Sequence, residues 1–161
     1  MATVYGTDVS YETALDDVVS ELGSLVTAMV GAINPKLVAV YEGHTSQIPM
    51  TFPCATVGLV SGRHELPAIA AALPGPATRT RIGISIRVLI GYAPVTYKDD
   101  RKIGRLINSV LNWFNEHRKL DSGAHVPDDV ETDIVARFDD TDTVGGEIRF
   151  DVFTHQTFTA A

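Results

Sequence analysis

The clearest pattern in the chain is a strict alternation of apolar and polar side chains over residues 82–92. The apolar positions are Ile82, Ile84, Ile86, Val88, Ile90 and Tyr92. Small or polar side chains lie between them, with Leu89 as the apolar exception. Because successive side chains of a strand point to opposite faces of a sheet, this pattern predicts a strand with one buried face. Its length favours the middle of an antiparallel sheet, with the second face turned to solvent or to a partner.

Two other segments repeat apolar side chains at helical spacing, about 100° per residue. The first covers residues 10–33 and ends at Asn34 and Pro35, and the second covers residues 99–120 and ends near Gly123. Each has polar side chains on the opposite side. Both segments are therefore predicted to be amphipathic helices that cover the sheet.

Short apolar or alternating runs predict four further strands, at residues 37–42, 54–60, 131–138 and 147–158. The element order is then α-β-β-β-α-β-β, which predicts an α+β fold with a mainly antiparallel sheet flanked by two amphipathic helices. In the last strand the alternation changes phase at Phe153, which predicts a bulge or a change of sheet face there.

Residues 61–80 contain three prolines and two glycines around an alanine-rich stretch at 67–73. The composition predicts a long loop or arm, with one or two helical turns in the alanine-rich part. Loops of this length inside a compact domain are usually functional. We expect the arm to contact a neighbouring chain.

Length and composition predict a single globular domain over residues 1–161, since 45% of the side chains are hydrophobic and 20% are charged. No run reaches the roughly 20 apolar residues that cross a bilayer, and the first residues do not resemble a signal peptide. These observations predict a protein made and kept in the cytoplasm. The formal net charge of -7 argues against wrapping nucleic acid tightly, but allows a surface that repels DNA.

Few residues suggest chemistry. Cys54 is the one cysteine, and its apolar neighbours predict a buried strand thiol. The five histidines show no metal-binding spacing, and the chain has no phosphate loop, nucleophile elbow or dinucleotide fingerprint. The sequence therefore gives an enzyme little support and predicts no catalytic residue, no metal and no cofactor.

The segment around Asp140 and Asp142 partly fits a calcium-binding loop, in which carboxylates at alternate positions converge on one ion. Val144 then stands where a ligand is needed, and Asp151 replaces the closing glutamate. A polar hairpin turn is the better interpretation. A bound ion at the two aspartates stays open.

Arg101, Lys102 and Arg105 lie near the amino-terminal end of the second predicted helix, where the helix dipole disfavours cations. Either a partner carboxylate holds them there, or they form a solvated face whose charge Asp99 and Asp100 offset. Both interpretations stay open.

The element order, the size, the helix at residues 101–113 and the closing strand at 148–154 resemble the tail terminator, or tail completion, proteins of long-tailed bacteriophages. The resemblance covers most of the chain and depends on pattern rather than on one diagnostic motif. It implies a non-enzymatic virion protein of the neck that forms a homohexameric ring on the tail tube. Such a ring ends tail polymerisation and joins the tail to the capsid connector.

The partners implied by this resemblance are the major tail tube protein and the head-tail connector protein, with DNA passing through the lumen without specific binding and no membrane contact. In a ring, Arg81, Arg87 and Leu89 on the second face of the long strand become candidates for subunit contacts, together with Arg101 and Arg105. The alternatives are another connector, head-closure or tube protein, a small-molecule or peptide binding domain, or a small hydrolase.

Overall fold

The computed structural model describes residues 11–29, 36–44, 50–65, 77–93, 99–121, 126 and 130–157. In this part of the chain two helices lie against one five-stranded sheet, which confirms the predicted α+β class. The elements are α1 (Tyr11–Ala28), β1 (Ala39–Glu42), β2 (Cys54–Glu65), β3 (Ala77–Tyr92), α2 (Asp99–Glu116), β4 (Glu131–Phe138) and β5 (Thr143–Thr157). Neither described helix combines the length and apolar character that crossing a membrane requires.

The strands follow the order β1-β2-β3-β5-β4. β3 is the middle strand and is antiparallel to both neighbours, as predicted, and β4 is antiparallel to β5. β1, however, pairs with β2 in parallel, so the sheet is mixed. The connection at residues 43–53 therefore returns across the sheet, as a parallel pair requires. Alternation reports which face a side chain occupies and carries no information about strand direction.

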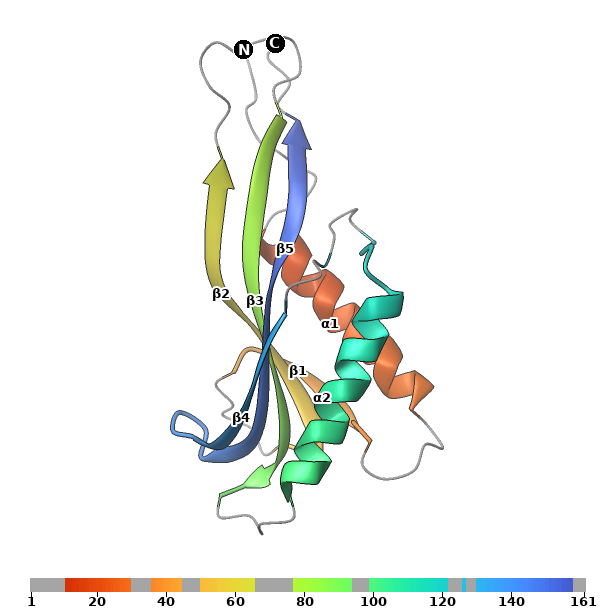
Figure 1. Cartoon of the computed structure of the whole chain (residues 1–161), viewed down its shortest axis with the longest axis vertical. Helices are drawn as coiled ribbons and strands as arrows, with labels where there is room; N and C mark the ends of the chain where they lie inside the picture. The colour runs from red at the N-terminus through yellow and green to blue at the C-terminus, as the bar shows by residue number, and fades with distance from the viewer. Residues whose placement is uncertain are drawn as a thin grey trace.

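Both helices cover the same face of the sheet (Figure 1), which we call the covered face; the other is the open face. The main core lies under the helices and contains the buried side of β3, from Ile82 to Val88. At Gly146 of β5 an added Cβ would come within 2.5 Å of Ile107 Cδ1. The missing side chain lets α2 approach the sheet closely there.

A bulge between Leu89 and Gly91 reverses the faces of β3 near its end. Tyr92 therefore pairs with Thr143 and lies against Phe52 at a ring-centroid distance of 4.8 Å, on the open face. The alternation placed Tyr92 with the buried isoleucines, and that prediction is wrong because a bulge shifts the phase by one residue.

The two helices are joined by a hydrogen bond that Trp113 Nε1 donates to Glu21 Oε2 at 2.9 Å. The Trp113 ring also stacks on His117 with a centroid distance of 4.1 Å. α2 ends at Glu116, before the predicted end at residue 120. Its apolar stripe is confirmed, since Ile103, Leu106, Ile107, Val110 and Phe114 are buried.

Part of the predicted arm is regular sheet. β2 continues to Glu65 and β3 already begins at Ala77, so both ends of residues 61–80 are paired strands. A bulge between Leu59 and Ser61 and several polar residues hide this strand from the alternation. The alanine-rich stretch at 67–73 lies outside the described residues.

With β5, these segments form a three-stranded extension of residues 61–65, 77–81 and 153–157, which continues past both helices (Figure 1). The bulge predicted at Phe153 is wrong, because pairing between β3 and β5 continues without a shift from Thr157 to Gly145. β5 begins at Thr143 rather than at 147, since its two glycines mask a strand signal that backbone pairing restores.

Candidate functional site

The open face presents polar side chains in rows that cross the sheet. One row places Thr56, Arg87, Glu147 and Asp133 opposite one another on four strands. The neighbouring row consists of Gly58, Ser85, Arg149 and Glu131. Cross-strand neighbours on one face lie close enough to interact. Residues far apart in sequence therefore form one continuous polar surface.

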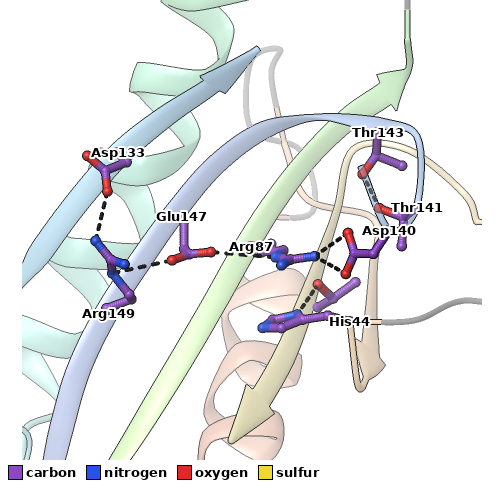
Figure 2. A network of polar contacts seen from close by, with 9 residues as sticks. His44, Arg87, Asp133, Asp140, Thr141, Thr143, Glu147 and Arg149 are labelled. Atoms are coloured by element: carbon purple, nitrogen blue, oxygen red, sulfur yellow. Dashed lines mark hydrogen bonds and ion pairs between the residues drawn. The ribbon is translucent and has the colours of Figure 1, made fainter. Parts of the chain in front are cut away.

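Arg87 lies at the centre of this surface (Figure 2). Its Nη1 donates to both carboxylate oxygens of Asp140, at 3.0 and 2.9 Å, and its Nε lies 3.6 Å from Glu147 Oε2. The guanidinium also lies over the Phe138 ring, 4.3 Å from its centroid. Burial raises the pKa of Asp140, but the hydrogen bonds and charge of Arg87 outweigh it, and the pKa lies below its ordinary value.

Arg149 contacts three carboxylates, one of which it shares with Arg87. Its guanidinium lies 2.9 Å from Asp133, 3.3 Å from Glu147 and 3.4 Å from Glu131 (Figure 2 shows the first two). Glu147 thus bridges Arg87 and Arg149. Among the described side chains of the open face, five carboxylates accompany three arginines, because Asp151 and Arg81 also point there by register. The described part of this face therefore carries more carboxylates than arginines, and Arg87 and Arg149 are held in ion pairs.

His44 extends this network toward β2. Its Nδ1 lies 2.9 Å from Thr56 Oγ1, and its ring lies over Gly58, where an added Cβ would meet ring atoms at 2.8 Å. Burial, together with the charge of Arg87, lowers the pKa of His44 to about 4. The imidazole is therefore neutral at physiological pH.

Several polar atoms of this surface are buried without a hydrogen-bond partner in the described part of the chain, among them His44 Nε2, the Ser85 hydroxyl and Arg87 Nε. A serine nucleophile is activated by an adjacent base. Among the described residues, no base lies within hydrogen-bond distance of the Ser85 hydroxyl. The positions of these atoms add unsatisfied polar groups to the sheet rather than a reactive pair.

An apolar cluster covers the other end of the open face. Leu89, Cys54, Met50 and Phe138 pack together there. The returning loop is held by two tyrosine hydroxyls, which accept hydrogen bonds from the amides of Met50 at 3.3 Å and Thr51 at 3.0 Å. The predicted buried thiol is confirmed, and burial raises the pKa of Cys54 to about 12.

The five predicted contact residues do not converge. Arg81, Arg87 and Leu89 lie on the open face, whereas Arg101 and Arg105 are exposed on α2, on the other side of the sheet. Leu89 lies on the predicted face but is 1% exposed, because Met50 of the returning loop and Phe138 pack against it. The sequence did not indicate that loop's path.

Sequence reasoning missed the carboxylates that surround the two arginines. Their signal was present in the alternation of charges, since Glu131 and Asp133 on β4 face Arg149 and Glu147 on β5. The missing information was the register between the two strands. Without it, opposite charges cannot be matched.

The hairpin between β4 and β5 turns at residues 139–142, which confirms a polar turn at the candidate calcium loop. Asp142 has a left-handed φ of 55°, which aspartate tolerates in turns. Asp140 is paired with Arg87, and Asp142 lies 2.7 Å from Arg137 Nη2. Among the residues described, no group of three histidine, cysteine or acidic side chains is arranged to hold a metal ion.

Comparison of the chain with protein-family models and with curated protein sequences gives no match. Inference about its function therefore depends on the residues and their geometry.

Proposed function

We propose that the protein is a tail terminator of a long-tailed bacteriophage, a non-enzymatic subunit of the virion neck. Six copies form a ring that caps the tail tube, ends tail polymerisation and joins the tail to the capsid connector. DNA passes through the lumen of this ring without specific binding. The observation that supports this proposal best is the acidic open face, a broad sheet surface without a described helix layer.

Electrostatics explains why such a surface suits a passage for DNA. An excess of carboxylates repels phosphates, and tight binding of DNA needs lysine and arginine side chains that are free to contact them. Arg87 and Arg149 are already engaged by carboxylates of the same face. A ring with the open faces turned inward would therefore let DNA move without strong bound states.

The virion alternatives are another connector, head-closure or tube protein, and they share the ring. A small-molecule or peptide binding domain is the second candidate. A cavity of about 340 Å³ between α2 and β5 favours it, with walls that include Phe114 and Phe150. A monomer that binds a small ligand in this cavity would support that alternative over a ring.

Native mass spectrometry and negative-stain microscopy test the ring, and we expect six copies around an open centre. Addition of the protein to growing tail tubes should stop their elongation. Tubes that continue to grow at the same rate would refute the terminator while leaving another ring protein of the virion in place. A monomer at all concentrations, with or without tubes, would refute both.

Binding of double-stranded DNA at low salt tests the acidic passage. Glu131→Lys combined with Asp151→Lys reverses two charges on the open face, and we expect rings of this variant to bind DNA more tightly than wild type. Glu116→Lys combined with Asp121→Lys makes the same charge change at exposed positions at and beyond the end of α2. Equal DNA binding by the two variants would show that the open face does not line the passage.

A further inference from the structure

Several of the exposed apolar side chains lie at the side edges of the sheet. The large hydrophobic residues that are exposed in the described part of the chain are Tyr11, Val38, Leu59, Val60, Tyr92 and Ile134. Leu59 is 42% exposed and Val60 is 59% exposed, where β2 has passed the end of its pairing with β1. Exposed apolar residues on an unpaired strand edge are typical of an interaction surface. We call these two residues the edge protrusion.

A cavity opens at the opposite edge of the sheet. It has a volume of about 340 Å³ and lies between the second half of α2 and β5, beside the start of β4. Its apolar walls include Leu111, Val130 and Phe150, and Asn112 and Arg118 contribute polar side chains. We call it the edge cavity. Its apolar walls suit aliphatic side chains.

The strand register relates the two features. Leu59 pairs with Ile84, and Ile84 pairs with Phe150 of the cavity wall. Ile84 and Phe150 both belong to the core under the helices, so Leu59 points to the covered face as the cavity does. Leu59 and the edge cavity therefore occupy one cross-strand row and one face, at the two opposite edges of the sheet, and Val60 follows Leu59 at the bulge.

We propose that Leu59 and Val60 of one copy insert into the edge cavity of the next copy, as the subunit contact of the ring. This inference rests on the proposed function, because it names the interface of that ring. A contact between different surfaces of identical chains is heterologous and repeats from copy to copy. Such a contact gives a ring where its rotation closes. Because Leu59 and the cavity wall lie in one row of the sheet, successive copies are shifted little along the strand direction.

A two-fold dimer does not fit these positions. In such a dimer the same patch of both copies meets at one contact. To fill both cavities, a two-fold dimer would have to bring the covered faces of two copies together, and both helices stand on that face between the protrusion and the cavity (Figure 1). Each cavity therefore takes the protrusion of the neighbouring copy. Further copies add in the same way until the ring closes.

Two kinds of variant test this contact in the full chain. Leu59→Glu with Val60→Glu removes the protrusion at exposed positions, and Leu111→Glu places a charge inside the cavity. Asn112→Trp is a second cavity variant, which blocks the cavity from an exposed position of α2. Circular dichroism confirms that each variant is folded, and native mass spectrometry reports the number of copies.

We expect each variant alone to be monomeric. A mixture of the protrusion variant with a cavity variant should give a heterodimer and nothing larger, because only one intact protrusion and one intact cavity can meet. Val38→Glu is the matched control, since Val38 is 40% exposed next to β1 on the same edge but in a different row. This control should form the wild-type ring.

The outcomes separate the contact from the function. Rings of normal size in the protrusion variant would overturn the proposed contact while the terminator function stands. Loss of the ring in Val38→Glu to the same extent would also overturn it, because the contact would then not be confined to this row. A monomeric wild type, with or without tail tubes, would overturn both the ring and the contact.

Discussion

Neutral His44 makes the stability of the fold depend on pH in a defined window. In the unfolded chain a histidine gains a proton below about pH 6.5, whereas burial and the charge of Arg87 keep His44 neutral in the fold until about pH 4. The unfolded state therefore binds more protons between these values, and stability falls as the pH falls through this window. Asp140 has a lowered pKa and loses its stabilising charge only under more acidic conditions.

The magnitude follows from the two pKa values of His44. Lowering the pH from about 7.5 to about 5 costs at most about 2 kcal/mol by linkage, and about 1 kcal/mol once screening of a partly exposed ring is included. His44→Gln removes the titration and keeps a polar side chain that can reach Thr56. The loss of stability between these pH values should therefore be about 1 kcal/mol smaller in the variant.

Urea unfolding at both pH values measures this difference, with fluorescence of Trp113, the one tryptophan, as the signal. A difference of about 1 kcal/mol corresponds to about 0.5 M in the urea midpoint for a domain of this size. Protein concentration is held constant, since assembly also stabilises the folded state. Equal losses in wild type and variant would refute the reasoning, because His44 would then titrate in the fold as it does in the unfolded chain.

Three further experiments test the packing of the sheet, two with pairs of substitutions and one with a thiol reagent. Gly145→Ala should lower the free energy of unfolding by about 3 kcal/mol or more, and Gly146→Ala by about 1–2 kcal/mol. The new methyl group meets backbone at Gly145 but only the ends of flexible side chains at Gly146. Thermal unfolding measures both costs, and equal costs would contradict this reasoning. Arg87→Gln should destabilise the fold by about 2–4 kcal/mol and Arg149→Gln by less than ~1 kcal/mol. The reason is that the Arg87 side chain is 16% exposed, whereas that of Arg149 is 44% exposed. Similar losses for the two variants in urea unfolding would contradict this prediction. Cys54 should resist a thiol-specific reagent in the folded protein and react once in denaturant, as its burial and its pKa of about 12 require; rapid labelling of the native protein would contradict it.

The fold class and the main core could be predicted from local periodicity, because burial on one face leaves a direct trace in the sequence. The alternation from Ile82 to Val88 and the apolar stripe of α2 both correspond to buried positions. The two bulges and the parallel pairing of β1 could not be predicted in this way. A bulge changes the phase without changing composition, and strand direction depends on the path of a loop whose residues have no periodic pattern.

The candidate site was predictable only in part, for a related reason. Arg87 could be named from the strand pattern alone, since it lies on the polar side of the alternation. Its partner Asp140 lies 53 residues away in the chain, on a turn placed beside it by pairing of β3 with β5 and of β5 with β4. In the same way, pairing of β2 with β3 and of β3 with β5 places Leu59 and Phe150 in one row. Contacts of this kind depend on register, which single-sequence patterns do not determine.

β3 passes through two regions that are stabilised differently. Its inner half, around Ile84 and Ile86, is buried under the helices, whereas residues 77–81 continue past them in the three-stranded extension (Figure 1). Three strands that no described helix covers (Figure 1) are marginal on their own. The extension therefore depends on the core for its folding, and amide hydrogens should exchange first at the Ala77 end and last near Ile86. A ligand or neighbouring copy that binds the extension would slow this exchange along one continuous strand, and β3 would then couple the extension to the core.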